Sequence, residues 1–388
     1  MKSHFNQLHS DQGMILFTSL AILSALLMVG VGARVMLQTD YRVLTNLRGA
    51  TEAFYLATAG LEWSKNEIAR ASTVPPAPAN RSENFSRGAF AVTFLSAALT
   101  SPLSAKILVR SMGSVGSSAQ TIQAQLSKTY DLVDAALGLR GNGAQVVFGG
   151  GGILFSGRDH DSVTGNPIAT AKPRAAVTAS DDALLGLVNA AARGLPQGSL
   201  ESGANVAASA TSEYLPEAAV SQLAGSLCSQ ATAIVNAVPA AGVLVYEDQT
   251  WGSRSTPELR CIDGLWEPGD AVTLAGNING SGILVVRNAD LIVSGAFRWE
   301  GLIIVTGREI GVKVTDASNK EILGGLVINE TGTPTSKAIL DIQGNFRLLF
   351  SRQGLAQTAH LIQPSILSTA YPSLPATLGQ DYWRVVTP

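Results

Sequence analysis

The hydrophobic pattern divides the chain into a helical N-terminal segment and a long strand-like remainder. An uncharged run begins at Met14 and continues to residue 33, immediately before Arg34. About 20 apolar residues are enough to span a bilayer as a helix. After the run, apolar side chains continue at the helical spacings of three and four, at Leu37, Tyr41, Leu44, Leu47, Phe54, Leu61 and Ile68. We therefore expect one helix over about 14–70, whose first third lies in a membrane and whose remainder is a stalk with one packed face.

Two simpler interpretations of this segment stay open. A secretory signal peptide has a shorter apolar region and a small-residue cleavage site, whereas this run is longer and no A-x-A-like site follows it. A plain single-pass anchor needs only the apolar run. Its orientation by charge alone would place the large domain in the cytoplasm, because Lys2 precedes the run while Arg34, Arg42 and Arg48 follow it.

The residues after the helix predict a linker and a small sheet. Residues 71–88 are rich in proline and polar side chains and are expected to form the linker. Three segments, 89–95, 105–109 and 121–126, are alternating or rich in β-branched residues, with glycine and serine turns between them. We expect a small sheet over 89–128 that packs on the apolar stripe of the stalk.

From residue 129 to residue 388 the pattern predicts a repeat domain made of short strands. One recurring turn contains Gly276, Gly295 and Gly344, and apolar runs start at Gly282, Gly301 and Gly325. A repeat of about 20–25 residues with a short strand and a glycine corner is typical of a solenoid, in which coils bury their apolar faces only against each other. We expect a right-handed β-helix, with a β-sandwich as the alternative.

Helical periodicity interrupts the repeat domain near 181–193 and 216–235, which predicts two helical insertions. The chain is thus expected to be an α+β protein: a long membrane and stalk helix, a small sheet, and a β-rich repeat domain.

Composition narrows the function classes. The chain has 388 residues, a net charge of −2 and only 14% charged residues, and it carries no basic stripe, so nucleic acid is not an expected partner. The two cysteines, Cys228 and Cys261, suggest one disulfide in an exported protein, which would stabilise by roughly 3–4 kcal/mol. Two unlinked buried thiols are the alternative.

The candidate chemistry of the repeat domain is sparse. Asp159 and Asp161 lie in the one dense polar cluster and suggest calcium, although such a site needs six or more oxygens and the full loop pattern is absent. A solvated turn is the alternative. Paired carboxylates can also indicate polysaccharide cleavage, and exposed aromatic side chains a sugar-binding face. The candidates for that face are Trp251, Trp266, Trp299 and Trp383, for which core packing is the alternative. No catalytic residues and no other cofactor are predicted.

The N-terminal segment resembles a known family. Gly13 before an apolar helix resembles the leader of type IV prepilins, which a dedicated peptidase cuts after the glycine. Residues 12–70 are similar to the N-terminal domain of PilX-type minor pilins, through Asn46-Leu47-Arg48 and Ala53-Phe54-Tyr55-Leu56-Ala57-Thr58-Ala59-Gly60-Leu61-Glu62. The repeat over 240–355 also looks like the C-terminal part of long PilX-type proteins. One departure is Thr18, which stands where major pilins have glutamate.

The resemblance implies an assembly protein and not an enzyme. The leader 1–13 would be removed between Gly13 and Met14 by prepilin peptidase, leaving a methylated N-terminus. The large domain would be periplasmic or on the extracellular filament, with a priming or adhesive role, and the helix would wait in the inner membrane before packing against other pilins and minor pilins. The side chains expected to pack are Leu16, Leu20, Leu23, Leu27, Leu37, Leu44, Phe54 and Leu61. Two alternatives are a K-like pseudopilin of type II secretion and a membrane-anchored carbohydrate-binding or carbohydrate-active β-helix.

Overall fold

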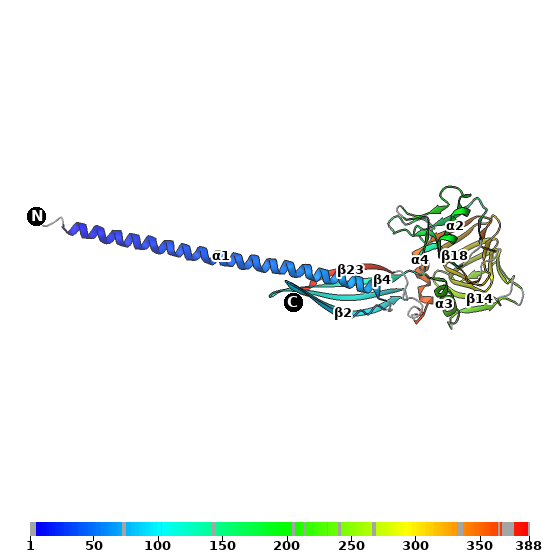
Figure 1. Cartoon of the computed structure of the whole chain (residues 1–388), viewed down its shortest axis with the longest axis horizontal. Coiled ribbons are helices and arrows are strands. Elements are labelled where there is room, and N and C mark those ends of the chain that lie inside the picture. Colours follow the sequence, from blue (N-terminus) through cyan, green and yellow to red (C-terminus); the bar gives the residue numbers. More distant parts are fainter. Residues whose placement is uncertain are drawn as a thin grey trace.

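The chain consists of a long helix, a sheet beside the end of that helix, and a strand-rich body beyond both (Figure 1). The computed structural model describes residues 5–386 except 72–74, 102, 142–144, 204–205, 213–214, 231, 240–241, 266–268, 333–336, 364 and 367–375. Helix α1 (Phe5–Arg70) is 66 residues long. The predicted α+β class, with a long N-terminal helix followed by a β-rich domain, is confirmed.

A five-stranded antiparallel sheet packs against the C-terminal third of α1. Its strands are β1 (Arg81–Phe85), β2 (Gly88–Ser101), β3 (Ser104–Val115), β4 (Ser118–Tyr130) and β23 (Ala376–Val386), in the order β1-β2-β3-β4-β23. The predicted linker over 71–88 was wrong in part, because residues 81–85 pair with β2 as an edge strand. Their polar side chains suit an edge, where one side of the strand faces water.

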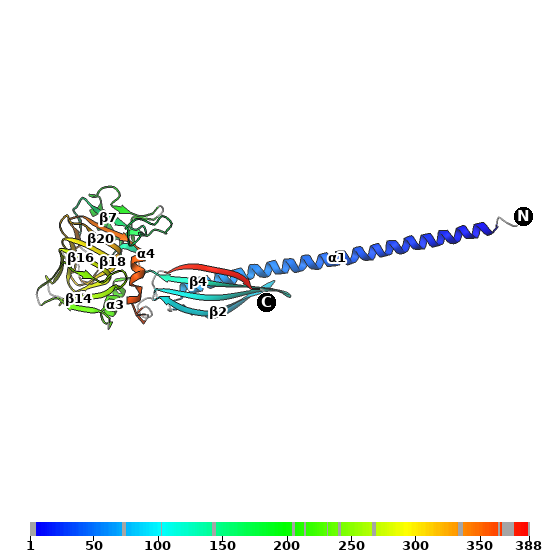
Figure 2. The same cartoon turned by 180° about the vertical axis from the view of Figure 1, so that it is seen from behind.

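The last strand corrects the predicted limits of the repeat domain. Residues 376–386 do not join that domain but return to the sheet beside α1, where Ala376 pairs with Tyr130 at the end of β4. The strand-rich body is therefore an insertion between two neighbouring strands, and the strand ends that flank it, Tyr130 and Ala376, lie at the same end of the sheet (Figures 1 and 2). A pairing between strands so far apart in sequence leaves no local signal, because each strand shows only its own alternation.

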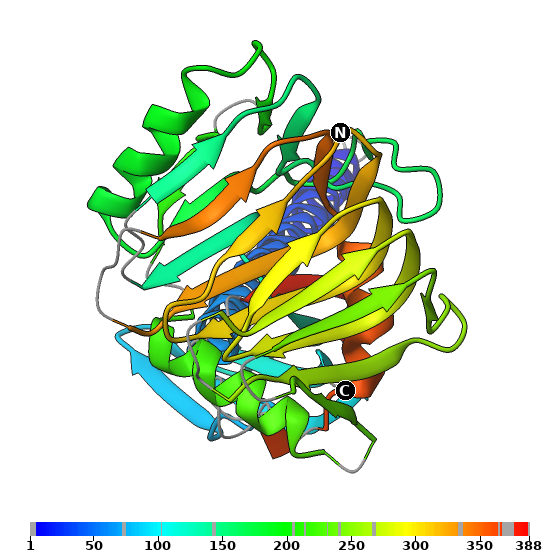
Figure 3. The ribbon, with the colours of Figure 1, turned by 90° about the vertical axis from the view of Figure 1, so that its right-hand side faces the viewer.

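The inserted body is a stack of coils, here called the coil stack. Successive strands alternate between two sheets, from β15 to β22, and every strand pair in the two sheets is parallel (Figure 3). One sheet contains β5 (Ala135–Gly141), β7 (Ile153–Ser156), β8 (Ala175–Ala179), β9 (Leu200–Glu201), β10 (Ser209–Thr211), β11 (Ile234–Ala237), β13 (Thr250–Trp251), β14 (Glu258–Asp263), β16 (Asn277–Arg287), β18 (Ala296–Gly307), β20 (Lys320–Glu330) and β22 (Phe346–Phe350). The other contains β6 (Gln145–Phe148), β12 (Val243–Glu247), β15 (Ala271–Ala275), β17 (Asp290–Val293), β19 (Val312–Val314) and β21 (Ala338–Ile342). Parallel pairing of this kind is that of stacked coils and not of an antiparallel sandwich.

A column of glycines fixes the register of the coils. Gly282, Gly301 and Gly324 are paired across β16, β18 and β20, and their φ angles are +137°, +130° and +153°. A Cβ at Gly301 would lie 2.2 Å from the carbonyl oxygen of Gly282, so a side chain does not fit. The predicted repeat was one residue out of register here, because Gly324, and not Gly325, occupies the position equivalent to Gly301.

Among the described residues, helices α2, α3 and α4 cover the coil stack. Helix α2 (Asp182–Ala192) begins where the Asp181 carboxylate accepts a hydrogen bond from the Leu184 N–H at 2.8 Å. Helix α4 (Arg352–Thr358) and the short 3-10 turn Ala359–Leu361 lie between the coils and the sheet of α1 (Figure 2).

Helix α3 (Glu217–Cys228) is shorter than predicted. The expected helix over 216–235 was wrong beyond Cys228, since residues 234–237 form β11 and pair with β14. The apolar residues in this stretch fit both periods, and the neighbouring strand decided the outcome.

Lys128 joins the sheet to the end of α1. Its side chain is buried, and its Nζ donates to the carbonyl oxygens of Ile68 at 2.8 Å, Ala69 at 3.2 Å and Ala71 at 2.9 Å. Burial lowers the pKa of Lys128, because removal from water disfavours the ammonium form. The cation nevertheless satisfies carbonyls that have no partner within the helix and complements the negative end of the helix dipole.

We expect Lys128→Met to reduce the free energy of unfolding by about 2 kcal/mol, because the helix end would keep buried carbonyls without donors. Chemical denaturation of the detergent-solubilised chain measures the change. Lys106→Met is the matched control, because it is the same substitution at a half-exposed position on the neighbouring strand. The Lys106 Nζ lies 3.6 Å from Asp381 Oδ2. Equal stability of the two variants would contradict a capping role for Lys128.

Candidate functional site

From Met14 to Leu47, α1 presents an apolar surface that no other described part of the chain covers. Leu16 is 73% exposed and Leu23 is 63% exposed, and the same holds for the other leucines predicted to pack in this part, namely Leu20, Leu27, Leu37 and Leu44. Within the described residues, one helix, Met14–Arg70, is long and apolar enough to cross a membrane. This exposed surface is the candidate functional site.

The first part of this surface, residues 14–33, has no charged residue and contains several small side chains. The Thr18 hydroxyl donates to the carbonyl oxygens of Met14 at 2.9 Å and Ile15 at 3.0 Å, so it is satisfied within the helix. A Cβ at Gly30 or at Gly32 would meet no atom within 4 Å. Such positions let another helix approach closely in a membrane.

The C-terminal third of α1 is anchored to the sheet by a face of small residues. Ala53, Ala57, Gly60 and Ser64 are all buried, at the helical spacing. A Cβ at Gly60 would lie 2.3 Å from Ser111 Oγ and 3.0 Å from a ring carbon of Phe90, so any larger residue would displace these side chains of the sheet. The buried Ala53, Ala57 and Gly60 therefore set the distance between helix and sheet.

The same contact is closest at Gly113 of β3. A Cβ there would lie 2.0 Å from the carbonyl oxygen of Ala53 and 2.5 Å from the backbone nitrogen of Ala57. Helix backbone and strand backbone are thus nearly in contact. Buried side chains further along the same helix face, Leu61 and Ile68 among them, continue this core toward the end of α1.

The structure divides the predicted helix residues into two groups. Leu61 is buried in the anchor, and Phe54 is half-buried there, with its ring 6.4 Å from that of Trp383. The six predicted leucines Leu16, Leu20, Leu23, Leu27, Leu37 and Leu44 are exposed and belong to neither core cluster of the described residues. Gly13 and Met14 lie within α1, whereas residues 1–4 of the predicted leader lie outside the described residues.

Asp159 and Asp161 serve different contacts. Asp159 is buried, and its carboxylate accepts from the backbone N–H of Arg352 at 2.8 Å and from that residue's guanidinium at 3.2 Å. Asp161 instead accepts from the backbone N–H groups of Val163 and Thr164, and the Thr164 bonds hold the pKa of Asp161 below its usual value. Across the described residues, no group of three His, Cys, Asp or Glu side chains could hold a metal ion.

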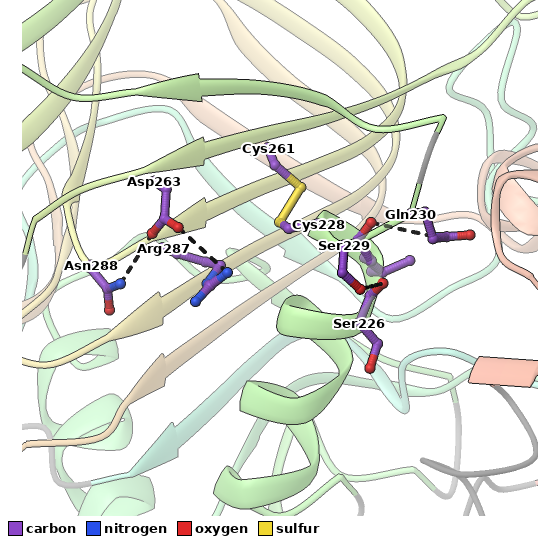
Figure 4. Close-up of a disulfide and its surroundings, with 9 residues drawn as sticks. Ser226, Cys228, Ser229, Gln230, Cys261, Asp263, Arg287 and Asn288 are labelled. Carbon is purple, nitrogen blue, oxygen red and sulfur yellow. Dashed lines mark hydrogen bonds and ion pairs between the residues drawn. A yellow bond between two sulfur atoms is a disulfide. The ribbon is translucent and has the colours of Figure 1, made fainter.

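Cys228 and Cys261 form a disulfide with a Cα–Cα distance of 5.6 Å (Figure 4). It ties the last residue of α3 to strand β14, so a covering helix is linked covalently to the coils. Asp263 on the same strand lies 3.5 Å from the guanidinium of Arg287 and accepts from the Asn288 amide at 3.1 Å.

The three candidate tryptophans within the described residues do not form a shared exposed face. Trp251 and Trp299 are buried in the coil stack, and Trp383 lies half-exposed on β23, next to α1. Trp266 lies outside the described residues. Core packing therefore accounts for Trp251 and Trp299.

Sequence reasoning missed a row of polar side chains on the outer face of the coil stack. Asn279, Arg298, Glu321 and Arg347 occupy registered positions on four successive parallel strands. A signal existed, since each lies at an outward position shortly after a turn of the repeat. It could be found only with the register of the coils in hand.

No family model and no curated protein matches the sequence. Among solved structures, the crystal structure of the competence-associated pilin ComZ from Thermus thermophilus matches with 11% identity and a TM-score of 0.27, over 87% of this chain and 97% of that one. A likeness at this TM-score is too low to support an inference about fold or function.

Proposed function

We propose that this protein is a minor pilin-like subunit of a type IV pilus or a related filament machine. The observation that carries the proposal is the division of α1 into an exposed apolar part and a C-terminal third anchored to an antiparallel sheet. A subunit built in this way can leave a membrane and pack its free helix among other helices while its sheet stays folded. The glycine before the apolar run and the segment 46–62 are the sequence features that support the same function.

The exposed part would first lie in the inner membrane and later against other subunits. Both environments suit leucine, because lipid and a packed helix bundle are equally apolar. The move therefore exposes little apolar surface to water. The Cys228–Cys261 disulfide supports a periplasmic or extracellular location for the coil stack, since disulfides persist in oxidising compartments. This favours export over the orientation that the flanking arginines alone would suggest.

A K-like pseudopilin of type II secretion is the second candidate from the same class. Thr18 in place of glutamate is compatible with it. The inserted body is strand-rich, however, and its described helices α2, α3 and α4 are short, whereas the resemblance to K-type proteins would imply a largely helical insertion. We therefore favour the minor pilin.

Gly13→Ala is expected to abolish cleavage of the leader and incorporation into filaments. Coexpression with a prepilin peptidase should give a mature chain that begins at Met14, and the variant should keep its original N-terminus. N-terminal sequencing and intact mass of the membrane-extracted protein measure this outcome.

Gly32→Ala is the matched control, because it is the same substitution in the same helix where the added Cβ meets no atom within 4 Å. It should be cleaved like the wild type. An uncut wild-type chain, or a cut beyond Ala33, would overturn the proposed function.

A further inference from the structure

The outer face of the coil stack carries a groove that runs across four coils. A depression of about 570 Å³ lies over β16, β18, β20 and β22. A second one of about 210 Å³ shares Asn279 and Arg298 with it. Because registered residues on stacked strands repeat every 4.8 Å or so, the groove offers equivalent positions at regular intervals.

Two columns of polar side chains line this groove. One contains Asn279, Arg298, Glu321 and Arg347, which are partners in the register of the four strands. The other follows the coil corner two residues earlier, where Asn277, Asn319 and Asn345 lie. Amide side chains donate and accept hydrogen bonds at the same time. Between the columns lie Phe297 and Lys320, which are partners in the register and are both buried, and the Lys320 ammonium is paired with Asp316 at 2.7 Å.

The charged side chains of the groove are held in fixed positions. Glu321 accepts from Arg298 at 3.1 Å and pairs with Arg347 at 2.8 Å, and Glu300 accepts from Arg254 at 3.0 Å. The Arg347 side chain remains 50% exposed, so part of its guanidinium faces the groove and solvent. Side chains already held by neighbours lose less conformational freedom when a ligand binds.

A turn that the sequence had marked as a metal candidate contacts two arginines of the groove. The Asp161 carboxylate closes this turn through the N–H groups of Val163 and Thr164. The carbonyl oxygen of Ser162 then accepts from Arg254 at 2.7 Å, and that of Val163 accepts from Arg298 at 3.2 Å. The cluster thus orients the arginines of the groove.

We propose that this groove binds a saccharide chain lying across the coils. Sugar hydroxyls both donate and accept, which matches a surface of amides, carboxylates and guanidinium groups. A polyanion such as nucleic acid fits less well, because Glu300 and Glu321 neutralise most of the charge of the groove's arginines, so the groove is not a basic stripe. Each glutamate is paired with arginine, so the groove binds a sugar chain without a free carboxyl group to act as acid.

The test uses the full chain in a detergent without a sugar headgroup and measures binding by isothermal titration calorimetry. The probes are neutral hexasaccharides of glucose and of N-acetylglucosamine, a hexamer of galacturonic acid, and a single-stranded DNA oligonucleotide. We expect at least one hexasaccharide to bind. Asn279→Ala and Arg347→Ala should each weaken that binding by about tenfold, because each removes hydrogen bonds to the sugar.

Arg193→Ala is the control, since it removes an exposed arginine at the end of α2, outside the groove. It should leave affinity unchanged, and thermal unfolding should be the same for all three variants. Absence of binding to every hexasaccharide would overturn the proposal, as would binding that is insensitive to both groove variants. Tighter binding of the oligonucleotide, lost at raised salt, would overturn it in favour of nucleic acid. None of these outcomes depends on cleavage at Gly13.

Discussion

Gly113→Val is expected to detach the sheet from α1 and to lower the free energy of unfolding by about 3 kcal/mol. The added side chain would begin 2.0 Å from the Ala53 carbonyl oxygen, and that atom belongs to helix backbone that cannot turn aside as a flexible side chain would. The helix must then move outward from Ala53 and Ala57, which opens the core between α1 and the sheet. Hydrogen exchange measured by mass spectrometry should show faster exchange in residues 53–68, together with a lower denaturation midpoint.

Met112→Val is the matched control for this contact. Met112 is the neighbouring residue on β3, is 43% exposed and faces the opposite side of the sheet. Valine suits an exposed strand position, so this variant should keep wild-type exchange in α1. If the Gly113 variant exchanged no faster than the Met112 variant, the close approach of helix and sheet would not be needed for the fold.

Loss of the Cys228–Cys261 disulfide is expected to lower the free energy of unfolding by about 4 kcal/mol in the chain-entropy model. The bond joins residues 33 apart in sequence and closes a loop of that length. Its removal therefore increases the conformational entropy of the unfolded chain. The Cys228→Ala, Cys261→Ala double variant should also expose α3 and β11 first, because α3 is then held to the coils by packing alone (Figure 4). Denaturation and hydrogen exchange over 217–237 measure the two effects.

Two comparisons separate the bond from the packing of the sulfur atoms. Wild-type protein in reductant should approach the stability of the double variant. Ser229→Ala, beside Cys228 but exposed, should remain like the wild type. A double variant within about 1 kcal/mol of the wild type would show that packing alone holds α3 in place.

The helix and the coils could be predicted from sequence because each has a local period. The leucines from Leu16 to Leu44 and the buried face from Ala53 to Ile68 follow the helical spacing, and the glycine turns recur along the coil stack. The predictions that were wrong lie where the local sequence pattern fits two structures. Ile234 and Val235 fit a helix or a strand equally well, and Gly324 and Gly325 are adjacent glycines of which only one occupies the registered position.

The candidate sites also divide into one that the local sequence predicts and others that depend on contacts between distant residues. The exposed apolar part of α1 could be expected from residues 14–47 alone, because no charged residue interrupts its first 20 positions. Asp159 and Asp161, in contrast, appear as one cluster in sequence and serve two separate contacts in space. The groove could not be expected at all, since Asn279 and Arg347 are brought together only by stacking of the coils.

By itself, the sequence determined the kinds of element in this protein and the uncovered apolar helix, because helix period, strand alternation and glycine corners are properties of neighbouring residues. Only the tertiary structure decided that β23 completes the sheet beside β4, that the coil stack is an insertion, and that polar side chains from four coils form one groove. The physical reason is that pairing between distant strands depends on register and on which edges remain free once the rest has packed.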